Sequence, residues 1–420
     1  MLLNPEPRVS GYLRLFRSRD YSMLWLASIA AAASEVAVGV TVTWSTWETT
    51  GSATAVGLLI SAISIPRLIL ETLVGRIVDS SDRRKLMVVG AVGVSALSVV
   101  LAVLTEGNGG SRLLGTLSIV WMLPAFSMLF SRARSSLLPR LITEQATLVS
   151  AQALLRTTTE GISVLSGVAA ILIPIVGRAP IMVAGVILAL VAALVAGQLS
   201  RTDQDRNGLK TLLPLRLFEG SFGEPLKTIR SNRFLTWFVV LVALSNVPHN
   251  ANMAMLVPMS AEKTGLGAQG YGAVEIALNL GVIAGYLLAG RLLSRGNPMN
   301  LAIAGVAWSA LTSTLIAVSS GRLAVVALFG AYGLSEGLFL PAYARFDLEV
   351  RDDLRGRVNA LFNVIALLLT PIAQVGAGAL SDAFGPSTLY GWAGLALAIV
   401  AVLALMSRPR IRAMDRVKGS

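Results

Sequence analysis

The sequence contains no cysteine and only one histidine. Without cysteine the chain has no disulfide framework and no thiolate metal site. One histidine is too few for a histidine-based metal centre, and a Ser-His-Asp triad is disfavoured. The sequence also lacks a Gly-x4-Gly-Lys-(Ser/Thr) loop, so direct use of ATP is not supported. These absences argue against an enzyme, and we expect neither a metal nor a cofactor.

Charged side chains are also scarce. They make up 14% of the 420 residues, whereas hydrophobic residues make up 54% and the mean hydropathy is +0.70. Soluble globular chains carry about 25% charged residues. The net charge of +12 does not indicate a nucleic-acid partner, because the basic residues fall in short loops between apolar runs. The composition predicts a polytopic membrane protein whose surroundings are the lipid bilayer.

Twelve apolar runs are each long enough to cross a bilayer, which takes roughly 20 residues. We expect the first to be a retained span and not a cleaved signal. The predicted fold is an all-α membrane protein with twelve transmembrane helices in two six-helix bundles. The bundles comprise residues 1–200 and 234–420, and the polar, basic segment 201–233 is a cytoplasmic linker. The runs are Tyr21–Trp47, Ala53–Val78, Leu86–Leu104, Leu113–Phe130, Val149–Val176, Ile181–Leu199, Phe234–Met259, Gly272–Leu293, Met299–Val318, Leu323–Tyr343, Val358–Leu380 and Leu389–Met406.

Lysine and arginine are distributed unevenly between the loops. With the N-terminus in the cytoplasm, only Arg112, Arg178, Lys263 and Arg322 of the 35 basic residues fall in outer loops. Nearly all the others fall in the cytoplasmic segments, as the positive-inside rule requires. This bias predicts that both termini are cytoplasmic.

The two halves of the chain show weak internal similarity. Four short matches occur in the same order at similar offsets, which fits two halves related by an axis along the membrane normal. They pair Thr50-Gly51 with Thr264-Gly265, Gly75-Arg76 with Gly290-Arg291, Ala133-Arg134 with Ala344-Arg345, and Gln152-Ala153-Leu154 with Asn359-Ala360-Leu361.

The turn between the second and third runs carries the most specific pattern. It resembles the loop Gly-x-x-x-Asp-(Arg/Lys)-x-Gly-(Arg/Lys)-(Arg/Lys) of the major facilitator superfamily, with matches at Gly75, Asp79, Arg83 and Arg84. Asp82 replaces the second glycine, as in the enterobactin-exporter and macrolide-efflux-like branch. Further stretches resemble the same branch: residues 50–57, Leu137-Leu138-Pro139 with residues 151–154, and Arg355-Gly356-Arg357-Val358.

The resemblance implies a cytoplasmic latch at this turn. Asp79 would meet the start of span eleven, near Arg357, where the helix dipole is positive. Gly75, Asp82, Arg83 and Arg84 would complete the latch, which must break for inward opening. The alternative is that the basic cluster only sets the topology.

Several ionisable residues lie inside the predicted spans. An ionised side chain in hydrocarbon costs at least about 2.5–3.5 kcal/mol, so such residues face a cavity or a partner. Glu35, in span one, could couple transport to protons or form a fixed pair with Arg67. Two further sets lie four residues apart on one helix face and could be structural pairs or line a cavity. These are Arg67 with Glu71, and Arg156 with Glu160.

Span seven carries a polar face. Asn246, His249 and Asn250 are spaced three and four apart beside Pro248, which predicts a kinked, polar wall of a substrate cavity. The alternative is hydrogen bonding between helices that holds the bundle together. Glu336 in span ten, one turn from Tyr332, is a further candidate for the cavity.

The resemblance implies a secondary transporter that moves substrate by alternating access. We expect a monomer in a bacterial cytoplasmic membrane that exports an amphiphilic small molecule, a siderophore or a macrolide-like drug, by proton antiport. The alternatives are an importer of the same fold, a membrane sensor or a lipid enzyme. Span five has Ser166-Gly167-Val168 where the antiporter signature has Gly-Pro.

Overall fold

The protein is described by a computed structural model covering residues 15–105, 110–142, 144–200, 223–292, 297–351 and 354–406. Helix is the only regular secondary structure in these ranges, and 12 segments within them are long and apolar enough to cross a membrane. The predicted all-α fold with twelve spans is therefore confirmed.

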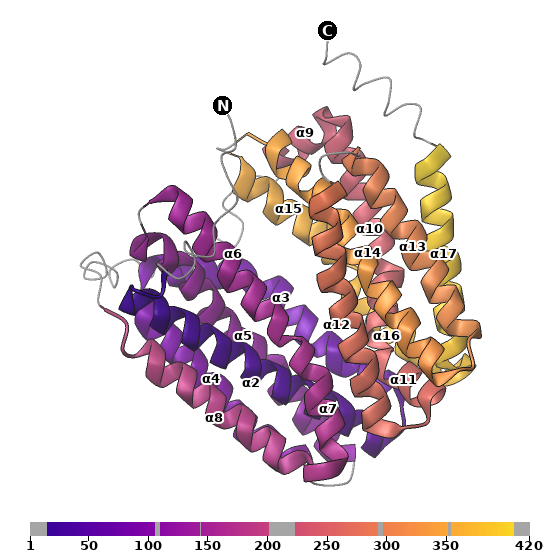
Figure 1. The fold of residues 1–420 in the computed structure, drawn as a ribbon, viewed down its shortest axis with the longest axis horizontal. Coiled ribbons are helices and arrows are strands. Elements are labelled where there is room, and N and C mark those ends of the chain that lie inside the picture. The colour runs from indigo at the N-terminus through magenta and orange to yellow at the C-terminus, as the bar shows by residue number, and fades with distance from the viewer. Residues whose placement is uncertain are drawn as a thin grey trace. The chain divides into compact units, whose positions relative to one another are not determined.

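The chain packs as two compact units. The first comprises Met1–Ser45 with Ile65–Leu217, and the second comprises Thr46–Ser64 with Phe218–Ser420. The end of α2 (Arg19–Thr50) and the beginning of α3 (Ala53–Ser80) thus pack with the second half of the sequence. Within each unit neighbouring helices pack side by side (Figure 1). Examples are α4 (Arg83–Thr105) on α5 (Gly110–Leu141) and α8 (Arg178–Ala196), and α12 (Gly267–Leu292) on α14 (Arg322–Glu349).

The helices of the first half are α2 Arg19–Thr50, α3 Ala53–Ser80, α4 Arg83–Thr105, α5 Gly110–Leu141, α6 Gln145–Ile162, α7 Val164–Val176 and α8 Arg178–Ala196. Those of the second half are α9 Gly223–Ser231, α10 Arg233–Ala254, α11 Leu256–Thr264, α12 Gly267–Leu292, α13 Pro298–Val318, α14 Arg322–Glu349, α15 Arg355–Leu367, α16 Thr370–Phe384 and α17 Pro386–Met406.

Spans seven and eleven are each interrupted by a short break. The break after α10 falls at Met255, and the break after α15 falls at Leu368 and Leu369. In each case a proline follows, Pro258 or Pro371, whose ring clashes with the carbonyl four residues earlier. Span five is also interrupted, at Ser163 between α6 and α7, where no proline lies nearby.

Glycines let α12 and α14 pack at backbone distance. A Cβ on Gly285 would lie 2.5 Å from the Leu334 carbonyl oxygen, and Cβ atoms on Gly281 or Gly337 would overlap backbone atoms of the facing helix. Small residues at such crossings allow close helix contact in membrane proteins. This seam fixes α14, and therefore the polar side chains that α14 carries.

Asn232 caps the start of α10. Its Oδ1 accepts hydrogen bonds from the backbone N–H groups of Phe234 (2.9 Å) and Leu235 (3.3 Å), while its Nδ2 donates to Glu349 on α14 (2.9 Å). These bonds satisfy N–H groups that have no partner inside the helix.

Asn232→Ala is expected to lower stability by about 1 kcal/mol, the usual effect of losing a cap. The midpoint of thermal unfolding in detergent measures the change. Asn232→Ser keeps a cap acceptor and removes the donor to Glu349 without placing a second carboxylate beside it, so its midpoint should lie between those of the wild type and Asn232→Ala. An unchanged midpoint for Asn232→Ala would contradict this role.

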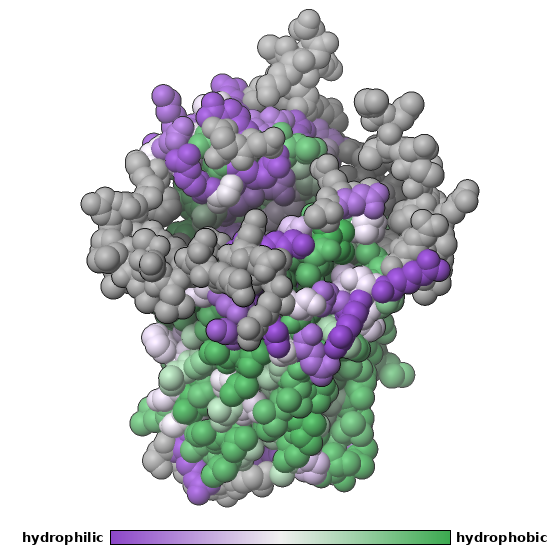
Figure 2. Space-filling view, turned by 90° about the vertical axis from the view of Figure 1, so that its left-hand side faces the viewer, coloured by the Kyte–Doolittle hydropathy of each residue, from purple (hydrophilic) through white to green (hydrophobic). Residues whose placement is uncertain are grey.

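The surface of the helices is rich in exposed apolar side chains. On α8 these include Val183, Ile187, Leu190 and Leu194. Figure 2 shows a broad apolar surface over the lower part of one face, with hydrophilic residues gathered above it. Such a surface is expected where helices contact lipid instead of water.

Candidate functional site

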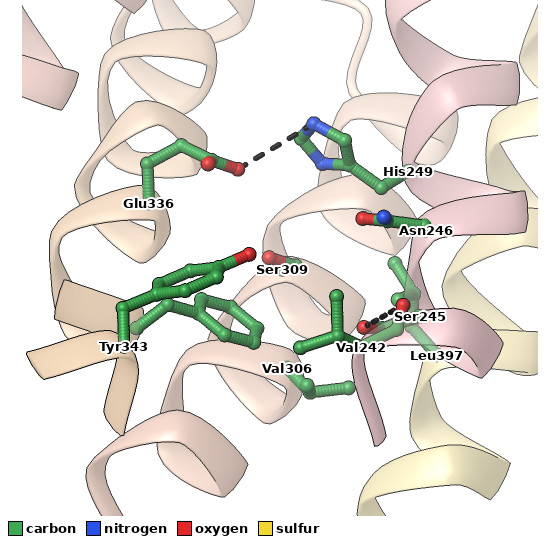
Figure 3. Close-up of a pocket in the computed structure, with 10 residues that line it drawn as sticks. Val242, Ser245, Asn246, His249, Val306, Ser309, Glu336, Tyr343 and Leu397 are labelled. Carbon is green, nitrogen blue, oxygen red and sulfur yellow. Dashed lines mark hydrogen bonds and ion pairs between the residues drawn. The ribbon is translucent and has the colours of Figure 1, made fainter. Parts of the chain in front are cut away.

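A pocket of about 70 Å³ lies inside the second unit. It is lined by Val242, Ser245, Asn246, His249, Val306, Ser309, Glu336, Phe339, Tyr343 and Leu397, which come from α10, α13, α14 and α17 (Figure 3). The α10 residues recur at three- and four-residue spacing, so they share one helix face. The lining mixes polar side chains, such as His249, Glu336 and Ser309, with apolar ones such as Val306 and Leu397.

His249 is held by a partner on each side of its ring. Its Nε2 lies 3.4 Å from Glu336 Oε1, and its Nδ1 lies 3.0 Å from the Tyr332 hydroxyl. Figure 3 shows the imidazole and the carboxylate pointing toward one another across the pocket. Tyr332 is fully buried and stacks on the imidazole, with ring centroids 5.8 Å apart. Both ring nitrogens are therefore engaged, Nε2 with the carboxylate and Nδ1 with the tyrosine hydroxyl.

The other predicted polar residues of span seven take different roles. Asn246 lines the pocket and donates from Nδ2 to the Ala366 carbonyl in the last turns of α15 (3.1 Å). Asn250 instead donates to the carbonyl of Asn246 on its own helix (2.8 Å). The helix runs on through Pro248.

A second set of charged residues lies in the first unit. Glu35, near the middle of α2, is exposed and interacts electrostatically with Arg67 on α3 and Arg134 on α5. Arg134 was not among the sequence candidates, because the apolar run of span four ends at Phe130. The helix continues to Leu141 and carries Arg134 within it.

Arg134 also opens onto a cavity of about 420 Å³ in the first unit. Arg156 and Glu160 line the same cavity, and within the described part of the chain no ion pair joins the two side chains. The cavity is lined by Arg134, Ser135, Leu138, Gln152, Leu155, Arg156, Thr159 and Glu160. Arginine, glutamate, amide and hydroxyl groups thus meet in one place.

Residues of the turn between α3 and α4 make contacts inside the first unit. Asp82 is the N-cap of α4, where its Oδ1 accepts from the Lys85 backbone N–H (3.2 Å). Arg83 is buried, and its Nε donates to Ser136 Oγ (2.7 Å). Arg84 is half-buried.

The proposed partners of the cytoplasmic latch are only partly described. Position 75 and the side chains of Asp79 and Glu71 lie outside what the structure describes. In the second unit, Arg357 Nη1 lies 3.2 Å from Glu224 Oε2 of α9. The latch between Asp79 and the start of span eleven stays a prediction.

Within the described ranges, no three His, Asp or Glu side chains are grouped so that they could hold a metal ion.

Solved structures of transporters share the fold over nearly the whole chain. A mutant of the nucleoside transporter NupG has a TM-score of 0.75 at 11% identity, covering 92% of this chain and 99% of its own. A POT family transporter in complex with a thioalcohol-conjugated peptide has a TM-score of 0.71 at 11% identity, covering 94% and 96%.

No curated protein matches the chain in sequence. Residues 24–373 match the Major Facilitator Superfamily, which is most of the chain. The chain therefore belongs to the Major Facilitator Superfamily and is a membrane transporter and not an enzyme.

Proposed function

We propose that this transporter exports an amphiphilic small molecule from the cytoplasm in exchange for protons, by alternating access. The pairing of His249 with Glu336 in the pocket of the second unit carries the proposal. Histidine gains and loses a proton near neutral pH, and ionisable groups inside transporters mark proton relays. The pair holds a proton while the transporter faces one side of the membrane and releases it on the other.

The lining of the pocket supports an amphiphilic substrate. Asn246, Ser309 and Glu336 offer hydrogen-bonding groups, while Val306 and Phe339 offer apolar surface. A cavity of about 70 Å³ holds one functional group of a drug-sized molecule and not the whole molecule. The substrate's polar group therefore competes with the His249–Glu336 contact, and this competition links binding to proton release.

Tyr332 positions the histidine for this exchange. Its hydroxyl engages Nδ1, so Nε2 is the nitrogen presented to Glu336. The hydrogen bond on one imidazole nitrogen determines the state of the other. Tyr332 is thus a positioning residue that acts through His249.

Tyr332→Phe keeps the stacked ring and removes the hydroxyl. We expect the dependence of transport on proton concentration to weaken at least about fivefold, the lower end of typical coupling between two ligands. Tyr390→Phe is the matched control, because the Tyr390 hydroxyl is equally buried but donates to the Asn252 carbonyl (2.8 Å) and not to His249. Equal proton dependence in both variants would show that Tyr332 acts only in packing.

The charged set of the first unit adds a second candidate for coupling. Glu35 has two cationic neighbours, Arg67 and Arg134, so a change in its protonation alters the balance of charge around it. Arg156 and Glu160 line the adjoining cavity and would contact the polar end of the substrate. In this scheme, one unit supplies the His249 pair and the other supplies Glu35.

The direction of transport and the class of substrate rest on the sequence resemblance. The stretches at residues 50–57 and 355–358 resemble the enterobactin-exporter and macrolide-efflux-like branch, which favours export of a siderophore or macrolide-like drug. The nucleoside and peptide transporters of similar structure support the fold alone, at 11% identity. We place the chain as a monomer in a bacterial cytoplasmic membrane with both termini in the cytoplasm.

Transport by membrane vesicles tests the direction. Inside-out vesicles with an acidic interior should accumulate the macrolide erythromycin or the siderophore enterobactin at least about fivefold above vesicles lacking the chain. A nucleoside serves as the comparison substrate. Accumulation by right-side-out vesicles in acidic buffer instead would mean import and would overturn the export proposal.

A further inference from the structure

The start of α3 is capped by a residue from the far end of the sequence. Within the second unit, Asp382 in the last turn of α16 receives three hydrogen bonds from the first residues of α3. Its Oδ1 accepts from the Ala53 backbone N–H (2.6 Å), and its Oδ2 accepts from the Thr54 backbone N–H (2.9 Å) and from Ser52 Oγ (2.8 Å). One carboxylate therefore binds three successive residues.

This arrangement gives a hydrogen-bond acceptor to each of the first three backbone N–H groups of α3. The first N–H groups of a helix have no partner inside it and form its positive end. Ser52 Oγ accepts from the Ala55 N–H (3.2 Å), so Ser52 caps that group while Asp382 takes the two before it. Hydrogen bonds to an ionised carboxylate are stronger than those between neutral groups.

Two glycines bring α3 and α16 into backbone contact beside the cap. A Cβ on Gly378 would lie 2.6 Å from the Ala53 carbonyl oxygen, and a Cβ on Gly57 would overlap the Gln374 carbonyl oxygen. Ala53 and Gln374 are 2% and 4% exposed, so water is excluded along this seam. Asp382 itself is exposed.

The seam joins segments that lie in different halves of the sequence. Residues 46–64 pack with the second unit, whereas α3 from Ile65 onward belongs to the first. In the predicted topology, α2 leads outward and α3 begins at the outer face. Any movement that separates the beginning of α3 from α16 must break the three hydrogen bonds.

We propose that Asp382 and residues 52–54 form an outer clasp that closes and opens once in each transport cycle. The clasp deepens the proposed function, because it identifies a contact that alternating access must break on the outer side. Exposure of Asp382 makes the break reversible, since water replaces the hydrogen bonds as they open. The clasp also gives the stretch at residues 50–57 a structural role.

Labelling of a single cysteine tests the clasp, because the chain has no cysteine of its own. Gln374→Cys places a thiol in the buried seam, and a membrane-impermeant maleimide applied to intact cells reports opening to the outside. Asp382→Asn removes the charge and replaces one acceptor oxygen with an NH2 donor, so the backbone N–H of Ala53 or of Thr54 loses its acceptor. Labelling should then rise about tenfold, as expected for losing a charged hydrogen bond.

Glu262→Gln is the matched control. Glu262 is an exposed acid of the second unit, on α11, and its carboxylate accepts a hydrogen bond from Ser387 on α17. Ser52→Ala removes one of the three hydrogen bonds to Asp382 and keeps the two from backbone N–H groups. Labelling should therefore rise less in Ser52→Ala than in Asp382→Asn. A graded increase of this kind is not expected from misfolding. Equal labelling of Asp382→Asn and Glu262→Gln, with both folded by size-exclusion chromatography, would overturn the clasp.

Measuring transport by the wild type alongside labelling of Asp382→Asn distinguishes failure of the clasp from failure of the export proposal. Increased labelling in Asp382→Asn together with no transport of erythromycin or enterobactin by the wild type would support the clasp and refute the export proposal. Transport by the wild type with unchanged labelling in Asp382→Asn would refute the clasp and leave export standing.

Discussion

Glu336→Gln is expected to abolish the dependence of transport on a proton gradient. Glutamine has nearly the same shape as glutamate but does not exchange a proton, so the contact with His249 Nε2 would survive only as a neutral hydrogen bond. Coupling between two ligands is typically worth 1–3 kcal/mol, or about 5–150-fold in affinity. Gradient-driven accumulation should fall by about that factor.

Exchange of substrate across vesicles without a gradient provides the internal control. This exchange needs the substrate to bind and the bundles to move, but it needs no net proton transfer. Glu336→Gln should therefore retain exchange while it loses accumulation. Glu262→Gln makes the same chemical change at an exposed site and should leave both rates unchanged. Normal accumulation by Glu336→Gln would show that the coupling site lies outside this pocket.

Gly281→Leu is expected to have the largest effect on folding. A Cβ at Gly281 would overlap the carbonyl group of Gly330 on α14, and backbone atoms cannot move aside as a flexible side chain can. Overpacking of this kind typically costs about 1–3 kcal/mol and more when backbone must shift. The yield of monodisperse protein and its thermal midpoint should both fall sharply.

Gly290→Leu on the same helix is the matched control. Nothing lies within 4 Å of a Cβ at Gly290, and the position is exposed. The two variants add the same side chain to α12 and differ only in what that side chain meets. If both unfold at the same temperature, the α12–α14 seam does not determine stability as described.

The sequence predicts the helices well because hydrocarbon thickness imposes a length on each span. Composition is less informative about where helices end, since α5 and α14 continue past their apolar runs into polar residues such as Arg134 and Arg345. The breaks in spans seven and eleven could have been predicted from Pro258 and Pro371, whose missing N–H groups end a helix locally.

The candidate site divides into parts that follow from local sequence and parts that do not. Asn246 and His249 share a face because of their spacing, and the structure brings His249 to Glu336 on another helix. That pairing depends on how α10 packs against α14, which spacing does not specify. Asp382 was missed for the same reason, because its partners lie 328 to 330 residues earlier in the chain.

Proton movement recorded with a pH-sensitive dye inside proteoliposomes tests the central claim most directly. Adding erythromycin or enterobactin to wild-type protein, with no gradient imposed, should move protons across the membrane as the substrate crosses. Glu336→Gln should give no proton signal, although it still exchanges substrate with liposomes preloaded with that substrate. Glu35→Gln shows whether the first unit contributes. A proton signal of unchanged size in both variants would contradict the account.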